Sequence, residues 1–147
     1  MPFGLPDDQQ KLTYGGYLRT RELTALQQLE SEPGQHDEAR FIIIHQVYEL
    51  WFKQVLYEVG SVIAIFENKE VDDNGGELNI AVHRMERVKT ILDVLVHQLE
   101  IMETMTPLDF LDFRDLLRPA SGFQSLQFKI LEARLGLRME ARFGKQY

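Results

Sequence analysis

The chain has 147 residues and a formal net charge of −7, with 44% hydrophobic residues, 27% charged residues and no cysteine. These values predict one soluble domain with a hydrophobic core, argue against a nucleic-acid binder, which needs a basic surface, and exclude disulfides, thiolate metal sites and thiol nucleophiles. Residues 1–20 have no basic segment before an apolar run, and polar residues interrupt the apolar stretch 41–56, so we expect a cytoplasmic chain without a secretory signal or a membrane span.

The N-terminal segment predicts an arm followed by one short helix. Met1–Gln10 is rich in Pro, Gly and Asp, which is typical of a loose arm. Leu12–Leu18 is aromatic and apolar around two glycines, so we expect no stable helix there by itself, but a segment that packs on its own core or on a neighbouring protomer. Leucines at helical spacing over residues 20–30 predict a short amphipathic helix capped by Thr20. The sequence SEPGQ then breaks the chain.

The most apolar stretch, from His36 to Val59, predicts a long central helix. Apolar side chains occupy one face and also the opposite side, so we expect this helix to be buried rather than docked on a surface. His45 in this run is either a core histidine with its ring hydrogen-bonded, or a pocket-lining histidine beside an aromatic wall formed by Phe41. The face comprises Phe41, His45, Tyr48, Phe52, Val55 and Val59, and the opposite side carries Ile42, Ile43, Leu50 and Leu56.

A second long helix is predicted after a turn. Residues 67–77 are charged and contain Asn-Gly-Gly, which predicts that the chain reverses. Apolar residues at steps of three and four then recur up to Met102. We therefore expect an antiparallel pair of helices over residues 36–68 and 77–104. His83 and His97 on the second helix are expected to be ordinary surface or groove residues rather than metal ligands.

Two short helices are predicted to follow. Residues 106–117 begin with Thr-Pro, which suits an N-cap followed by a first helical position. Pro119 ends that helix, and Ser121 with Gln124 fits a capping box that opens another, running to about residue 135 before Gly136. These elements together predict an all-α fold: a long antiparallel hairpin with short flanking helices, divided into an arm over residues 1–19 and a helical domain over 20–147.

Two polar features on the short helices have two readings each. Arg114 lies four residues after Phe110 and so shares its face. It is either a surface salt-bridge residue or, beside an apolar pocket, a clamp for a carboxylate. The helix start at Ser121 and Gly122 presents backbone N–H groups that bind either an anion or water.

Four strings resemble one family. LTYGGYL, HDEARFIIIHQVYELWFKQ, ETMTPLDFLDFRDLL and PASGFQSLQFKILE occur in this order from about Leu12 to Gly136 and are similar to the N-terminal half of tryptophan 2,3-dioxygenases. The resemblance implies a haem-dependent oxidoreductase that uses O2 to open the indole ring of L-tryptophan, giving N-formylkynurenine in the kynurenine pathway of tryptophan catabolism. It also implies ferrous haem b, a homotetramer and part of a larger helical bundle.

The resemblance also implies roles for single residues on the substrate side. His45 matches the distal histidine near the indole N–H and is the catalytic candidate, and Phe41 matches the ring against which the substrate packs. Arg114 matches the arginine that binds the substrate carboxylate. Phe110 stands where family members have Tyr or Phe, so the hydroxyl contact of the Tyr versions is absent here. The isoleucines that complete the expected apolar wall are Ile42, Ile43 and Ile44.

Further matches concern the cofactor and a neighbouring protomer. Ser121 and Gly122 match the turn that lies over the haem. Tyr14 and Leu18 match residues that reach the pocket of another protomer in the family's tetramer. These four residues are expected to complete a site that the substrate-side residues begin.

The chain departs from the family in one respect. The family's proximal haem histidine lies downstream of the matched region, and none of this chain's histidines matches it, so the expected metal ligands from this chain are none. We expect a truncated product or one part of a split protein with a companion C-terminal polypeptide, in preference to a degenerate relative, because the substrate-side residues are intact. The alternative function is a non-enzymatic helical interaction module without haem. The chain's histidines are His36, His45, His83 and His97.

Overall fold

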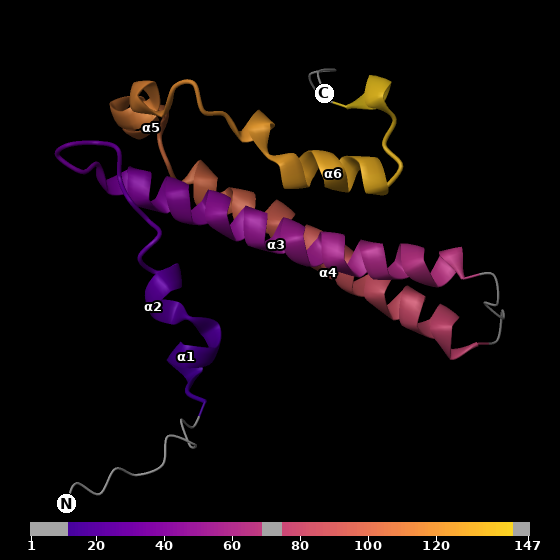
Figure 1. Cartoon of the computed structure of the whole chain (residues 1–147). Helices are drawn as coiled ribbons and strands as arrows, with labels where there is room; N and C mark the ends of the chain where they lie inside the picture. The colour runs from indigo at the N-terminus through magenta and orange to yellow at the C-terminus, as the bar shows by residue number, and fades with distance from the viewer. Residues whose placement is uncertain (1–11, 69–74, 143–147) are drawn as a thin grey trace, which may run out of the picture.

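The computed structural model describes residues 12–68 and 75–142, and all its regular elements in these ranges are helical (Figure 1). The predicted all-α fold is therefore confirmed. The expected loose arm over Met1–Gln10 and most of the expected turn after the central helix lie outside the described residues. The α-helices are α1 (Tyr14–Leu18), α2 (Thr20–Leu23), α3 (His36–Glu67), α4 (Gly76–Glu103), α5 (Pro107–Arg114) and α6 (Leu126–Arg134), with short 3-10 turns at Asp115–Leu117, Gly122–Gln124 and Met139–Ala141.

The two longest helices, α3 and α4, lie side by side and run in opposite directions (Figure 1). This confirms the predicted antiparallel pair. Between them, the phenol of Tyr48 donates to the carbonyl of Leu95 at 2.7 Å, and the amide of Gln98 donates to the carbonyl of Ile44 at 3.3 Å. The main hydrophobic core lies along this contact and extends to α6, and it consists of Val55, Val59, Val88, Ile91, Leu95 and Leu131.

One ion pair crosses the hairpin inside its hydrophobic contact. The carboxylate of Glu58 is 3% exposed and accepts hydrogen bonds from Arg87 Nη1 and Gln54 Nε2, both at 2.8 Å. The hydrogen bond from Arg87 lowers the pKa of Glu58, and this effect, with the bond from Gln54, exceeds the opposing effect of burial. Because an unpaired buried carboxylate is costly, the pair favours the one register of α3 and α4 in which both partners meet.

Helix α6 also packs on α3, on a different side from the one that α4 contacts (Figure 1). Gln127 Nε2 donates to the carbonyl oxygen of Glu49 at 2.9 Å and to its side-chain Oε2 at 2.8 Å. Near the end of α6, a Cβ atom placed on Gly60 would lie 2.9 Å from Arg134 Nη1. Glycine at this position therefore leaves room for the arginine side chain beside α3.

The expectation that α3 is buried on all sides is wrong. Helices α4, α5 and α6 contact only part of its circumference. Ile43, Leu50 and Trp51 are 47%, 51% and 37% exposed, because the described residues place no helix over that side. The buried residues of α3 are Glu38, Ile44, Val55, Glu58, Val59 and Val62.

The N-terminal elements also differ from expectation. Leu12–Leu18 forms the helical turn α1, because the Thr13 side chain accepts a hydrogen bond from the backbone N–H of Gly16 at 3.1 Å. Helix α2 ends at Leu23 instead of continuing to about residue 30, and Thr20 is its first residue rather than its cap. The reason is tertiary: Gln46 of α3 donates to the carbonyl of Leu26 at 3.2 Å, so the following residues bond to α3 instead of extending α2.

Of the two helix starts predicted after α4, one is confirmed and the other differs from the prediction. The Thr106 cap of α5 is confirmed as a capping box with Asp109. The box of Ser121 and Gln124 also forms, but it opens only a 3-10 turn, and α6 starts separately at Leu126 under a second cap, Ser125. The non-helical backbone of Ser125, with φ −58° and ψ 108°, separates the two.

Membrane-spanning helices are not found within the described ranges: none of the helices there is both long enough and apolar enough to cross a bilayer.

Candidate functional site

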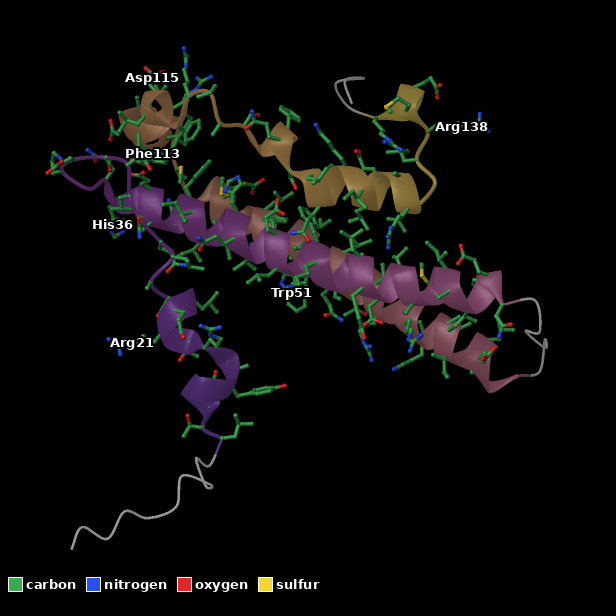
Figure 2. All side chains as sticks on the ribbon, in the orientation of Figure 1. Arg21, His36, Trp51, Phe113, Asp115 and Arg138 are labelled. Carbon is green, nitrogen blue, oxygen red and sulfur yellow. The ribbon has the colours of Figure 1, made fainter. Side chains whose placement is uncertain are left out.

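Aromatic rings from α3 and α5 gather at the start of the hairpin. The ring of Phe41 lies 4.2 Å from the ring of His45, 5.6 Å from that of Phe110 and 5.6 Å from that of Phe113, measured between centroids. Phe113 is fully buried between α5 and α3 (Figure 2). These rings form an apolar wall with one imidazole beside it, and the stacked contact of Phe41 with Phe110 and its edge-on contact with Phe113 are arrangements that aromatic pairs favour.

The hydrogen bond of His45 determines its tautomer. Its Nδ1 lies 2.7 Å from the backbone carbonyl oxygen of Phe41. Because a carbonyl oxygen can only accept, Nδ1 carries the proton, and in the neutral form of the ring Nε2 is then a hydrogen-bond acceptor. His45 is half-buried and lines a groove. It therefore has features of both readings: a ring tied to the backbone, and a polar group facing a pocket.

The groove that His45 lines runs between α3 and the segment from the 3-10 turn Asp115–Leu117 to α6, and it encloses about 980 Å³. Aromatic side chains from both helices form its floor, and the rings of Phe52 and Phe128 lie 5.4 Å apart across it. Charged residues stand on its rim. The lining residues are Phe41, His45, Tyr48, Glu49, Phe52, Leu117, Ala120, Ser121, Gly122, Phe123, Ser125, Phe128, Lys129 and Glu132.

Arg114 lies at the end of α5, next to this wall. Its guanidinium carbon is 5.9 Å from the centroid of the Phe110 ring, within the range of a cation–π contact. Arg114 is exposed and forms no ion pair within the described ranges. Its N–H donors are therefore available to an anionic ligand that rests on the aromatic wall.

Ser121 and Gly122 line the groove, but side chains of the same turn already accept hydrogen bonds from some of its backbone N–H groups. Gln124 Oε1 accepts from the backbone N–H of Ser121 at 3.1 Å, and Ser121 Oγ accepts from that of Phe123 at 3.3 Å. The box thus uses two of the N–H groups that the sequence suggested for an anion.

Other candidates lie away from the groove. Ile44 is 4% exposed within the hairpin, whereas Ile43 is 47% exposed, and neither they nor Ile42 line the groove. Tyr14 and Leu18 are 78% and 44% exposed on α1, which lies apart from α5 and α6 (Figure 1). These roles stay predictions.

Sequence reasoning missed part of the site. Tyr48 and Phe52 were placed on the His45 face, so their spacing already pointed to the groove. No sequence pattern indicated Phe128, Lys129 and Glu132. They line the groove only because α6 crosses α3 there. Glu49 is likewise identified by its contact with α6.

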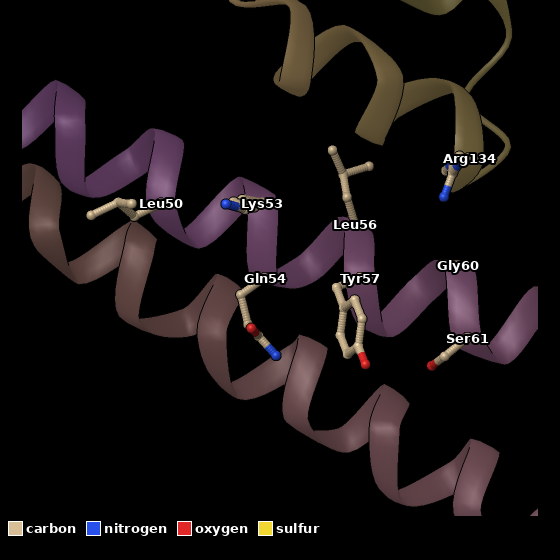
Figure 3. Close-up of a pocket in the computed structure, with 8 residues that line it drawn as sticks. All are labelled: Leu50, Lys53, Gln54, Leu56, Tyr57, Gly60, Ser61 and Arg134. Carbon is tan, nitrogen blue, oxygen red and sulfur yellow. The ribbon is translucent and has the colours of Figure 1, made fainter. Parts of the chain in front are cut away.

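A second groove of about 720 Å³ lies farther along α3. Lys53 and Arg134 border it, and Arg134 points from α6 toward Gly60 (Figure 3). The predicted surface histidines His83 and His97 are both exposed on α4. In the part of the chain that the structure describes, no group of three or more His, Cys, Asp or Glu residues could hold a metal ion.

The comparisons with known proteins agree on one family. A family model described as tryptophan 2,3-dioxygenase matches residues 5–147. The tryptophan 2,3-dioxygenase of Alteromonas mediterranea is 52% identical over 138 residues, covering 90% of this chain and 38% of that protein. Those of Mus musculus and Xenopus tropicalis are 51% and 50% identical, covering 89% and 86% of this chain but 33% and 32% of their own lengths. The chain thus spans about a third of the length of these relatives.

Proposed function

The chain belongs to the tryptophan 2,3-dioxygenase family, and on that premise we propose that it is the substrate-side part of a haem-dependent dioxygenase acting on L-tryptophan. The product is N-formylkynurenine, in the kynurenine pathway of tryptophan catabolism. One observation carries the proposal: an aromatic wall has His45 with an acceptor nitrogen on one side and Arg114 with available donors on the other.

The chemistry of tryptophan matches these groups. The indole ring needs an apolar surface, which Phe41 and Phe110 provide at 5.6 Å from each other. The indole N–H needs an acceptor, and Nε2 of neutral His45 is one. The carboxylate needs a cation, and the planar fork of Arg114 forms two parallel hydrogen bonds where a lysine would form one. Phe110 has no hydroxyl to add to this contact.

The groove also suits one face of a haem. Phe128 is 44% exposed and Phe123 is 68% exposed, so they leave apolar surface for a flat macrocycle, with the Ser121–Gly122 turn in the same lining. Ferrous haem b, when bound, supplies the activation of O2. His36, His83 and His97 do not line the groove, so we propose that the axial ligand comes from outside the described residues.

Assembly and location belong to the same proposal. The exposed side chains of Tyr14 and Leu18 support contact with a neighbouring protomer in a homotetramer. The uncovered side of α3 supports contact with a companion C-terminal polypeptide. The division into an arm over residues 1–19 and a domain over 20–147, and a cytoplasmic location, stay predictions.

The alternative is an interaction module that has the same helices but binds no haem. Exposed apolar residues on α4, such as Val94 at 47% and Val96 at 65%, favour a partner surface. Reconstitution with ferrous haem separates the two functions. An enzyme part acquires a Soret band when its companion polypeptide is supplied, whereas a module stays colourless.

The proposal is tested by measuring L-tryptophan binding by isothermal titration calorimetry, in the absence of O2, with the chain reconstituted with its companion polypeptide and ferrous haem. We expect Arg114→Lys to weaken binding about tenfold or more, since one charge-assisted hydrogen bond contributes about 1.5–3 kcal/mol. The matched control is Arg118→Lys, at an exposed arginine whose Nε lies 3.4 Å from Asp115, and it should bind as the unmodified chain does. Failure of the unmodified chain to bind L-tryptophan, or equal loss in both variants, would contradict the proposal.

A further inference from the structure

We propose that Arg40 is a positioning residue of the substrate site, which joins the start of α3 to the end of α4, close to where α5 begins, and thereby helps to set the place of Arg114. The inference deepens the proposed function and rests on it, because it assumes that Arg114 binds the carboxylate of the ligand. The sequence pattern assigns no role to Arg40, because a charged residue near the start of a helix is usually exposed to solvent.

Arg40 makes two short contacts with different helices. Its Nη2 lies 2.7 Å from Asp37 Oδ1, one turn earlier on α3. Its Nη1 donates to Thr104 Oγ1 at 2.7 Å, and Thr104 is the C-cap of α4. The Thr104 hydroxyl in turn donates to the carbonyl of Ile101 at 2.7 Å. The guanidinium therefore ties the first turn of α3 to the last turn of α4.

Helix α5 begins beside these contacts, because its N-cap, Thr106, is two residues after Thr104. Asp109 Oδ2 accepts from Thr106 Oγ1 at 2.6 Å and from the backbone N–H of Thr106 at 2.9 Å. These hydrogen bonds from Thr106 lower the pKa of Asp109, with smaller effects from the positive charge of Arg40 and from the side chain of Asp37. The carboxylate that caps α5 thus lies in the electrostatic reach of the pair formed by Arg40 and Asp37.

Two kinds of contact restrain α5, and they do so differently: its rings pack on α3, and Arg40 holds the end of α4, which leads into α5. Phe110, next to Asp109, lies with its ring 5.6 Å from that of Phe41, next to Arg40. Apolar ring contacts are weakly directional and permit small rotations of α5. Charge-assisted hydrogen bonds require defined distances and angles. The hydrogen bond from Arg40 to Thr104 fixes the end of α4, from which α5 continues, and so restrains the rotation of α5 that the rings leave open.

A change at the start of α5 is transmitted to its end. Arg114 is five residues after Asp109, which is about 7 Å along the axis of a regular helix. The capping box makes the first turn rigid, so a rotation of that turn moves the guanidinium of Arg114 relative to His45. A displacement of about 1 Å is enough to break one of two parallel hydrogen bonds to a carboxylate.

Stability alone does not account for the arginine. The side chains of Arg40 and Asp37 are only 30% and 18% exposed, so water screens their attraction less than at an open surface. Within the described ranges, Arg40 Nε is buried without a hydrogen-bond partner, which costs free energy. An apolar side chain of similar length would avoid that cost, but it would bond neither Asp37 nor Thr104.

The test compares two ligands by isothermal titration calorimetry: L-tryptophan, and L-tryptophanol, which keeps the ring and the ammonium group but lacks the carboxylate. Arg40→Met should weaken L-tryptophan binding about tenfold, the loss expected for one charge-assisted hydrogen bond, and leave L-tryptophanol binding unchanged. Arg40→Lys should recover part of the loss, because an ammonium can reach one of the two acceptors. The control, Arg87→Met, removes the ion pair that joins Arg87 of α4 to Glu58 of α3 and should leave the ratio of the two affinities unchanged.

Each result decides the inference. Equal weakening for both ligands in Arg40→Met would show a merely structural role and overturn the proposal, as would a changed ratio in Arg87→Met. If the unmodified chain binds no L-tryptophan, the proposed function fails, and NMR of the free chain decides the positioning itself. In that case, loss of the nuclear Overhauser contacts between Phe41 and Phe110 in Arg40→Met supports the inference, and unchanged contacts overturn it.

Discussion

At the scale of single residues, His45 and Arg114 are both polar groups beside the same rings, but their environments differ. The Nδ1–H of His45 is held by the Phe41 carbonyl at 2.7 Å, so the imidazole is fixed in orientation and offers one acceptor. Arg114 is exposed and free to take up a ligand carboxylate. We propose that His45 orients the ring of the substrate and that Arg114 holds its charge.

This assignment predicts a ranking of two variants in a complex reconstituted with the companion polypeptide and ferrous haem. Arg114→Lys should lower kcat/KM for L-tryptophan about thirtyfold or more, equivalent to about 2 kcal/mol. His45→Ala should cost less than the 10²–10⁴-fold loss typical of a general base, because an orienting hydrogen bond contributes about 1–3 kcal/mol.

Steady-state formation of N-formylkynurenine measures both variants, and Arg118→Lys serves as the control. An Arg114→Lys enzyme with unchanged kcat/KM, together with an inactive His45→Ala enzyme, would reverse the two roles while leaving the family intact.

At the scale of elements, buried carboxylates fix the contacts of α3. Glu58 bonds Arg87 of α4. Glu38 is fully buried and accepts from the backbone N–H of Glu30 and from both the backbone N–H and the hydroxyl of Ser31. Burial acts to raise the pKa of Glu38, and these hydrogen bonds outweigh it, so the pKa is lowered. One carboxylate thus holds the hairpin, and the other holds the segment before α3.

A lowered pKa makes the hairpin sensitive to acid. A carboxyl group with a lower pKa in the folded state stabilises the protein above its unfolded pKa, near 4.5 for Glu58, and this contribution is lost as the pH falls through the folded pKa. Urea unfolding followed by circular dichroism should therefore show stability falling below about pH 4.5. Glu58→Gln should reduce the dependence of the unfolding free energy on pH. The dependence that remains comes from Glu38 and Asp109, whose pKa values are also lowered.

Arg87→Met at pH 7 should destabilise the chain by about 2 kcal/mol, because it leaves the Glu58 carboxylate buried without its cation. This loss of stability is smaller than the loss expected for a fully buried ion pair, because the Arg87 side chain is 49% exposed. Lys89→Met, which removes an exposed pair on the same helix, should leave stability unchanged. A Glu58→Gln variant with the same acid slope as the unmodified chain would contradict this account.

At the scale of the whole molecule, much apolar surface is uncovered. The tyrosines of α1 are 78% and 70% exposed, and the uncovered side of α3 includes Leu50 at 51% exposure. Exposed apolar surface of this extent often marks contact with other chains.

We therefore expect Leu12–Leu18 to pack against another protomer in a dimer or a dimer of dimers. Deletion of residues 1–18 should lower the oligomeric state in sedimentation velocity experiments, because it removes the aromatic side chains of α1. Deletion of residues 1–10 is the matched control, since it keeps α1, and it should have no effect. An unchanged sedimentation coefficient distribution after the longer deletion would count against an intersubunit role for this segment.

The sequence by itself determined the parts of this protein that depend on local patterns. The repeat of apolar residues at steps of three and four placed both hairpin helices within one residue of their observed ends, because helix periodicity is a property of neighbouring residues. The Thr106 cap was predictable for the same reason, since its partner Asp109 is three residues away. The motif strings indicated the family and, through it, the candidates Phe41, His45 and Arg114.

Only the tertiary structure decided which sides of the helices are covered and which residues meet in the groove. Arg40 and Thr104 are 64 positions apart, and Glu49 and Gln127 are 78 apart. No local pattern encodes such contacts, because they depend on how whole helices cross. The same reason explains the errors: α2 ends early because Gln46 bonds the carbonyl of Leu26, and α3 stays half uncovered because its apolar residues outnumber the neighbours that the described residues provide.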